Sequence, residues 1–132
     1  MTHHASCSCG QLHLDVEGEP ARVSVCHCLA CQQRTGSAFG AQIRFRRDQV
    51  DGPHGHSTAF TRVGDSGNEV TFHFCPTCGT TLYWPIGPDF IAVALGAFAD
   101  PKFPWSPKHS VYEERAHAWS RVPTGPDVEH MD

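Results

Sequence analysis

Short runs in which apolar and polar residues alternate recur along the chain. Between residues 11 and 16, Leu12, Leu14 and Val16 alternate with polar neighbours, which is the period of a strand with one buried face. Similar runs follow, and Gly, Pro or another turn-forming residue separates most of them. We therefore predict short strands at residues 11–16, 22–25, 39–45, 59–62, 70–74, 80–84, 90–95, 110–113 and 118–122.

The segments between these runs predict turns, loops and free ends. Residues 26–35 have room for one helical turn, which Gly36 would end. The pattern as a whole predicts an all-β sandwich or closed sheet with few or no long helices. We further expect loops at residues 51–67 and 100–107, a hairpin turn at residues 75–79, a disordered end at His3 and His4, and a frayed polar tail at residues 123–132.

The length and charge of the chain exclude several classes of protein. Its 132 residues suit one domain, with a core between about residues 6 and 122. The net charge of -4 argues against binding to nucleic acid or to an anionic membrane, because both need a basic surface. No run of 18 apolar residues and no export signal is present, so we expect a cytoplasmic protein without a membrane span. The oligomeric state stays open, with a homo-oligomer as one option.

Seven cysteines carry most of the chemical information in this sequence. Clustered cysteines in a reducing compartment usually bind metal or take part in catalysis. Thiolates two or three positions apart in a tight turn can reach one zinc ion, which prefers four ligands in a tetrahedron. The clusters are Cys7-Ser8-Cys9, Cys26-His27-Cys28-Leu29-Ala30-Cys31 and Cys75-Pro76-Thr77-Cys78.

Two partitions of the seven thiols fit this spacing. In the first, Cys7, Cys9, Cys75 and Cys78 form a closed site of four thiolates, and Cys26, Cys28 and Cys31 form a site with one open vertex. In the second, Cys28 and Cys31 join Cys75 and Cys78, and the other three cysteines are left over. We favour the first partition because it keeps each contiguous cluster whole.

Histidines near the cysteines offer further candidate ligands. His27 lies between two cysteines and is an alternative fourth ligand, although a residue inside Cys-x-Cys more often points away. His54 and His56 form a His-x-His pair, for which a solvated loop is the simpler interpretation.

The cysteine clusters and their neighbours resemble the glutathione-dependent formaldehyde-activating enzyme family. The likeness covers most of residues 6–121. All the cysteine clusters in this order, with Thr35-Gly36-Ser37 after the middle one, make it specific. The matching stretches are Ser6-Cys7-Ser8-Cys9-Gly10, Val25 to Gly40, Phe74 to Tyr83, Ala92 to Phe98 and Ser110 to Ala116.

The resemblance implies a zinc-bearing β-sandwich of two small antiparallel sheets. It also implies a carbon–sulfur lyase that joins formaldehyde to glutathione as S-hydroxymethylglutathione. The zinc roles carried over are structural for Cys7, Cys9, Cys75 and Cys78, and catalytic for Cys26, Cys28 and Cys31. A thiol bound at the open zinc would lose its proton and attack a small aldehyde.

Residues that would bind the thiol can be proposed from the chemistry of glutathione. Its two carboxylates suit the guanidinium group of arginine, and Arg34 is the first candidate because it follows the middle cluster closely. Thr35, Gly36 and Ser37 would offer backbone donors or merely cap the turn. Further candidates are Arg44, Arg46 and Arg47 for the carboxylates, and Trp84, Trp105 and Trp119 for the pocket wall or the core.

Two functions without catalytic turnover are alternatives to the enzyme. In one, both metals are structural and the protein is a zinc-stabilised binding module. In the other, the three-thiolate site is labile and senses metal or thiol stress. A fourth protein ligand at the open site would favour the module, whereas a position open to an outside thiol would favour the enzyme.

Overall fold

The computed structural model describes residues 1–64, 66–120 and 126–132, and β-strands form most of its regular structure. Its single α-helix, α1 (Leu29–Thr35), has seven residues, and three short 3-10 turns complete the regular elements. The prediction of an all-β fold with two sheets and few helices is confirmed. The two sheets differ in size, since one has three strands and the other has eight.

The smaller sheet is antiparallel and has β2 (His13–Glu17) at its centre. Its edge strands are β1 (Thr2–Ser6) and β5 (Val50–His54). In β2 the side chains of Leu14 and Val16 are buried and alternate with more exposed ones, as the sequence pattern predicts.

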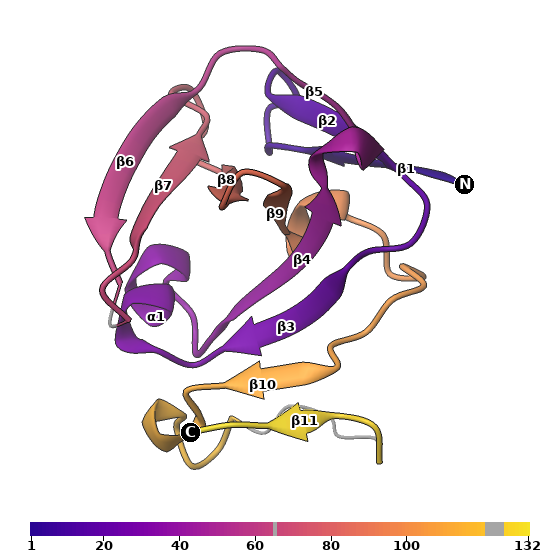
Figure 1. Cartoon of the computed structure of the whole chain (residues 1–132). Coiled ribbons are helices and arrows are strands. Elements are labelled where there is room, and N and C mark those ends of the chain that lie inside the picture. Colours follow the sequence, from indigo (N-terminus) through magenta and orange to yellow (C-terminus); the bar gives the residue numbers. More distant parts are fainter. Residues whose placement is uncertain (65, 121–125) are drawn as a thin grey trace.

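The larger sheet has the strand order β11-β10-β3-β4-β9-β8-β7-β6. Most of its neighbours are antiparallel, but β10 runs parallel to β3 and β11 runs parallel to β10. Figure 1 shows this sheet curving around α1, with β6 and β7 on one side of the helix and β3 and β4 on the other. Its strands are β3 (Arg22–Cys26), β4 (Gly40–Arg46), β6 (Thr58–Val63), β7 (Glu69–Phe74), β8 (Thr81–Ile86), β9 (Phe90–Ala94), β10 (His109–Val111) and β11 (Glu129–His130).

The main core lies between the two sheets. Alternation in β4 sends Ile43 and Phe45 into this core, where both are fully buried. The opposite face of the same strand carries Gln42 and Arg44, and these residues line a cavity. The curved sheet therefore has one apolar face that packs on the small sheet and one hollow face on which arginines lie beside apolar side chains such as Phe72 and Trp84.

Four predictions about local structure are wrong. His3 and His4 belong to β1 instead of a disordered end, and the His3 ring packs against Phe103 and Trp105. Part of the expected 51–67 loop is β5, and the polar tail contributes β11, which pairs with β10. Residues 118–120 form a turn in place of a strand, while residues 121 and 122 lie outside the described residues.

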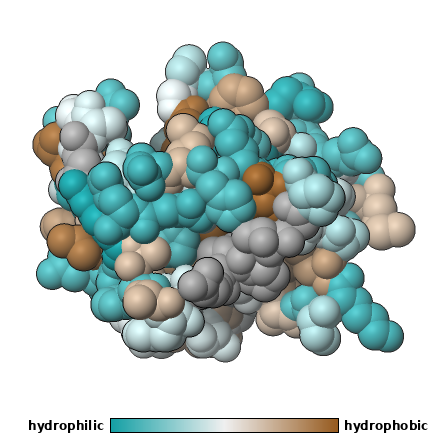
Figure 2. Space-filling view, turned by 90° about the horizontal axis from the view of Figure 1, so that it is seen from below, coloured by the Kyte–Doolittle hydropathy of each residue, from teal (hydrophilic) through white to brown (hydrophobic). Residues whose placement is uncertain are grey.

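The outer surface is mostly polar on the side that carries β10 and β11. Seen from below, this face is mainly hydrophilic, with separated apolar groups (Figure 2). Within the described residues, no helix has the length and apolar character needed to cross a membrane.

Candidate functional site

Two turns that are far apart in the sequence bring four cysteines together. Cys7 and Cys9 follow β1, and Cys75 and Cys78 lie in the turn between β7 and β8. The four Sγ atoms all lie within 4.8 Å of one another. Cys9 Sγ is 3.6 Å from Cys7 Sγ and 3.7 Å from Cys75 Sγ. Tetrahedral zinc with bonds of about 2.3 Å would separate neighbouring sulfurs by about 3.8 Å, so this donor set fits one zinc ion.

Hydrogen bonds reach these sulfurs, and they favour the thiolate form at Cys75 and Cys78. At Cys9 a backbone hydrogen bond with Gln11 lowers the pKa, but burial and the thiols of the three other cysteines outweigh it and raise this pKa to about 11. The backbone N–H of Leu12 donates to Cys7 Sγ at 3.3 Å, and Gln11 Nε2 donates to Cys75 Sγ at 3.0 Å. Hydrogen bonds with Thr80 lower the pKa of the Cys78 thiol to about 5. Donors directed at sulfur stabilise its negative charge, which is the form that binds zinc.

The remaining three cysteines form a second cluster at the start of α1. Cys26 ends β3, Cys28 is the N-cap residue of the helix, and Cys31 lies in its first turn. Their Sγ atoms also lie within 4.8 Å of one another, and all three residues are buried. The backbone N–H of Cys31 donates to Cys28 Sγ at 3.3 Å. The helix cap therefore also holds the Cys28 sulfur in place.

The second cluster is prepared to carry negative charge. A hydrogen bond from the Cys26 thiol, together with those from Cys28 and the nearby charge of Arg34, lowers the pKa of Cys31 to about 6. The same hydrogen bond raises the pKa of Cys26. Three thiolates fill three vertices of a zinc tetrahedron and leave one vertex for an outside ligand. The donor set therefore fits a zinc ion with an open position.

His27 is not part of either cluster in the described chain. Its ring is buried, and Nε2 lies 3.2 Å from Ser110 Oγ. Burial lowers the pKa of this imidazole, which favours the neutral ring. The ring thus bonds toward β10, and among the described residues the fourth position beside the three thiols has no protein ligand.

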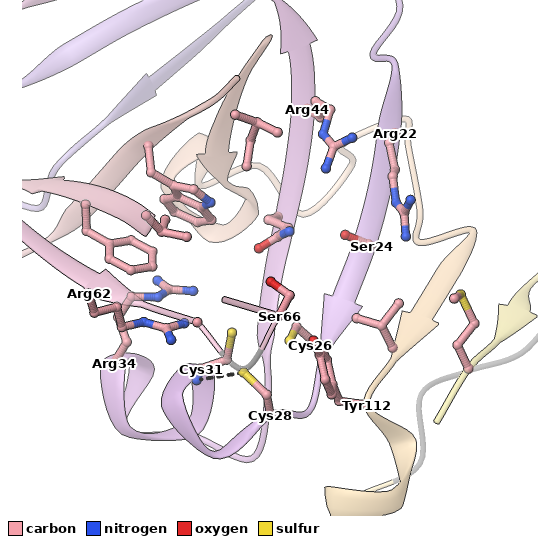
Figure 3. Close-up of a pocket in the computed structure, with 18 of the residues that line it drawn as sticks. Arg22, Ser24, Cys26, Cys28, Cys31, Arg34, Arg44, Arg62, Ser66 and Tyr112 are labelled. Atoms are coloured by element: carbon pink, nitrogen blue, oxygen red, sulfur yellow. Dashed lines mark hydrogen bonds between the residues drawn. The ribbon is translucent and has the colours of Figure 1, made fainter. Parts of the chain in front are cut away.

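The three cysteines open into a cavity of about 450 Å³ on the hollow face of the large sheet. Figure 3 shows Arg22 and Arg44 on one side of this cavity, Arg34 and Arg62 on the other, and the cysteines between them. Within residues 1–64, 66–120 and 126–132, none of these four guanidinium groups forms an ion pair with a carboxylate. The cavity therefore offers four cationic groups to a bound anion.

Aromatic side chains hold the arginine that follows the cysteine cluster. The Arg34 guanidinium carbon lies 4.6 Å from the Trp84 ring centroid and 5.1 Å from that of Phe72. Arg62 stacks on Phe72 as well, at 5.3 Å. Nε of Arg34 and Nε of Arg62 are buried and lack a hydrogen-bond partner in the part of the chain described here. Stacking thus holds both guanidinium groups in place while these two Nε donors stay available to a ligand.

Several residues predicted for thiol binding lie elsewhere. Arg46 pairs with Asp48, and Arg47 donates to the Gly87 carbonyl at 3.4 Å. Trp105 packs on the core and Trp119 is 76% exposed, so of the three tryptophans only Trp84 is among the described lining residues.

Thr35, Gly36 and Ser37 end the helix. Thr35 Oγ1 donates to the Cys31 carbonyl at 2.8 Å, and Gly36 takes the left-handed conformation of a C-cap. Among the described residues, Arg34 lines the cavity, whereas Thr35, Gly36 and Ser37 do not. Their contact with a thiol stays a prediction, and their observed contacts shape the end of α1.

Sequence reasoning missed two of the four cavity arginines, Arg22 and Arg62. Arg22 is the cross-strand partner of Arg44, so two like charges face each other on β3 and β4. Burial, with a smaller contribution from Arg22, lowers the pKa of Arg44. The alternation of Arg22 with buried Val23 indicates that Arg22 lies on the face of β3 opposite the core, so the sequence held a signal for it. The residues around Arg62 carry no such signal, because its place in the cavity depends on how β6 curves back toward α1.

Comparisons with known proteins agree with this geometry. The family model described as glutathione-dependent formaldehyde-activating enzyme matches residues 2–115. "Uncharacterized lyase C29B12.13" of Schizosaccharomyces pombe is 29% identical over 87 residues, which cover 62% of this chain and 56% of that protein. The chain thus spans little more than half the length of this curated relative.

A solved structure shares the fold. A crystal structure of a Rhodobacter sphaeroides protein has a TM-score of 0.56 and 19% sequence identity, and the match covers 75% of this chain and 92% of that one. At this identity the likeness concerns the fold alone. The family model matches most of the chain, from β1 to the turn after β10, including both cysteine clusters. The chain therefore belongs to the glutathione-dependent formaldehyde-activating enzyme family.

Proposed function

We propose that this protein is a zinc-dependent carbon–sulfur lyase that joins a glutathione-like thiol to a small aldehyde such as formaldehyde. The observation that supports this proposal most strongly is the position of the three-thiol cluster. Cys26, Cys28 and Cys31 line a cavity that also presents four arginines without carboxylate partners in the described chain. A purely structural metal site would need neither the cavity nor the cationic groups.

The arginines suit a thiol that carries two carboxylates. Glutathione has one carboxylate near each end and its thiol between them. Arg22 and Arg44 on one side of the cavity, with Arg34 and Arg62 on the other, would bind these two groups and direct the thiol at the cysteines. Arginine pairs bind carboxylates with defined geometry, so this arrangement would position the sulfur as well as supply affinity.

The reaction is an addition in which no atom is lost and none is oxidised. The thiol sulfur forms a bond to the aldehyde carbon, the π electron pair moves to oxygen, and the thiol proton ends on that oxygen. A zinc ion held by Cys26, Cys28 and Cys31 would lower the pKa of the incoming thiol and thereby generate the thiolate. The buried rings of Phe72 and Trp84 would keep water from the reacting groups.

Exchange NMR tests the activity directly, because the approach of glutathione, formaldehyde and S-hydroxymethylglutathione to equilibrium can be followed with and without the protein. Zinc-loaded protein should accelerate this approach, and Cys31→Ser should abolish the acceleration while the protein stays folded. If the zinc-loaded protein binds glutathione but does not change the rate, the enzyme proposal fails and a binding module becomes the better description.

Calorimetry tests the thiol site separately. We expect Arg34→Ala to weaken glutathione binding by about tenfold, which corresponds to about 1.4 kcal/mol, because one charge-assisted contact is lost. Arg46→Ala is the matched control, since Arg46 pairs with Asp48 outside the cavity. Equal effects of the two changes would argue against the assignment of Arg34.

A further inference from the structure

The outer face of the small sheet carries a group of histidines that the cysteine chemistry does not use. In β1 and β2, Ala5, Leu14 and Val16 point into the core, so alternation places His4 and His13 on the opposite, outer face. His13 is also the direct cross-strand partner of His54 in β5. Each of the three strands of this sheet therefore contributes one imidazole to the same face.

The rings lie at the spacing of shared metal ligands. The ring centroid of His13 is 5.5 Å from that of His4 and 5.3 Å from that of His54. Two imidazoles bound to one tetrahedral ion at about 2.0–2.1 Å have centroids about 5 Å apart. His13 thus has a neighbour at the required centroid distance on each side, and the outer rings would turn to bring their nitrogens to one ion with it.

Two carboxylates orient the outer rings. His4 Nδ1 lies 2.9 Å from Asp15 Oδ1, and His54 Nε2 lies 3.3 Å from Asp51 Oδ1. A carboxylate that accepts from one ring nitrogen leaves the other nitrogen with a lone pair for a metal. The side chains of His4 and His54 are 56% and 51% exposed, so they have room to rotate toward a shared ion.

The central ring is incompletely satisfied. Nδ1 of His13 is buried, and it has no hydrogen-bond partner within the described chain. A buried ring nitrogen without a partner loses the hydrogen bond that water would otherwise supply. A bound cation is one partner that would restore this interaction.

We propose that His13, with His4 and His54 beside it, binds a divalent transition-metal ion on the outer face of the small sheet. Imidazole ligands select ions such as Zn²⁺, Co²⁺ or Ni²⁺ over Mg²⁺ and Ca²⁺. The site is separate from both cysteine clusters and does not depend on the lyase activity. The ion would connect the edge strands β1 and β5 to β2, so binding should also raise the melting temperature.

Cobalt provides a probe that distinguishes this site from the cysteines. Protein loaded with zinc at the cysteine sites is titrated with Co²⁺, and bound cobalt is followed by its visible spectrum while retained zinc is counted. We expect one further equivalent of Co²⁺ to bind without loss of zinc and without thiolate-to-cobalt charge-transfer absorption. Displacement of zinc, or appearance of that absorption, would place the cobalt at the cysteines and overturn the proposal.

Substitutions assign the ligands. His13→Ala should weaken Co²⁺ binding at least tenfold and remove the metal-dependent rise in melting temperature. His56→Ala is the matched control, because His56 is exposed and lies two residues beyond His54, outside the row of rings. Unchanged affinity in His13→Ala, or an equal loss in His56→Ala, would contradict the site. If His13→Ala does not fold, His54→Ala on the edge strand β5 gives the same test with the same outcomes.

Discussion

At the scale of single residues, the best-defined group in the cavity is the Arg34 guanidinium. It follows the three-cysteine cluster on α1 and lies against Trp84 and Phe72. Gly40, at the start of β4, makes room for this group, since a Cβ atom there would lie 2.8 Å from Arg34 Nη2. The absence of a side chain at position 40 is thus part of how Arg34 is positioned.

Gly40→Ala should therefore impair thiol binding without unfolding the protein. The added methyl group would displace the flexible end of Arg34, because a contact of 2.8 Å is too short for a carbon atom. We expect glutathione affinity to fall several-fold and the melting temperature to change by only a few degrees. Calorimetry and thermal unfolding measure the two quantities, and unchanged affinity would show that Arg34 adapts without loss.

Glu113 makes a pH-dependent contribution to stability. Its carboxylate accepts from Ser110 Oγ at 2.7 Å and lies 2.6 Å from His130 Nδ1. Burial raises the pKa of Glu113, but the hydrogen bonds with His130 and Ser110 outweigh burial and hold this pKa below its ordinary value. The carboxylate therefore stabilises the fold above the pKa of an ordinary glutamate, and this stabilisation is lost as the pH falls through the lowered pKa.

We expect Glu113→Gln to be less stable than the parent at pH 7, by on the order of 1 kcal/mol, and to lose less stability on acidification. Urea unfolding at pH 7 and pH 4 tests this expectation. The neighbouring Glu114→Gln serves as control, because Glu114 only approaches Arg115 at 3.9 Å on the exposed surface. Parallel pH curves for Glu113→Gln and the parent would contradict the assignment.

At the scale of elements, the two cysteine clusters are built differently. The four-cysteine cluster joins the turn after β1 to the turn between β7 and β8, and Cys9 is 66 residues from Cys75. The three-cysteine cluster is local to the end of β3 and the start of α1. Closing the 66-residue loop between Cys9 and Cys75 costs about 4 kcal/mol of chain entropy. Structural zinc supplies about 10–16 kcal/mol of apparent binding free energy, which exceeds this cost. The long-range cluster should therefore contribute most to the stability of the fold.

Cys78→Ser and Cys31→Ser compare these two roles. We expect Cys78→Ser to melt at a far lower temperature, because the four-ligand site loses its closed coordination. Cys31→Ser should keep the fold and lose only the metal of the open site. Thermal unfolding with zinc counted in each variant tests the comparison. If Cys31→Ser unfolded as readily as Cys78→Ser, the division into a structural and a reactive site would be wrong.

At the scale of the whole molecule, the two sites should release metal in two steps. Four thiolates satisfy every vertex of one zinc ion, whereas three leave the other dependent on an outside ligand. A mild chelator should thus remove one equivalent of zinc while circular dichroism reports an intact fold. Loss of both equivalents in a single step together with unfolding would contradict this expectation.

Local sequence pattern was enough to predict most of the strands and the candidate metal ligands. Alternation around Leu12, Leu14 and Val16 reflects burial of one strand face, which is a local property of the chain. The spacing of the cysteines reflects the reach of thiolates in a tight turn, so all seven could be named as candidate ligands without coordinates, while their division between two sites stayed open. The strands β1, β5 and β11 escaped prediction because short polar edge strands obtain their order from neighbours and lack a strong local pattern.

The tertiary structure decided which distant residues meet. The spacing of the cysteines left two partitions open, and only the packing of β1 beside the β7–β8 turn brings Cys7 and Cys9 to Cys75 and Cys78. Arg62 joins Arg34 over Phe72 because the large sheet curves around α1, and curvature depends on the sum of all strand pairings. Likewise, the row of His4, His13 and His54 exists only through the strand register of the small sheet. Residue type and spacing are local and can be read along the chain, whereas register and curvature are collective and appear only when the strands pair.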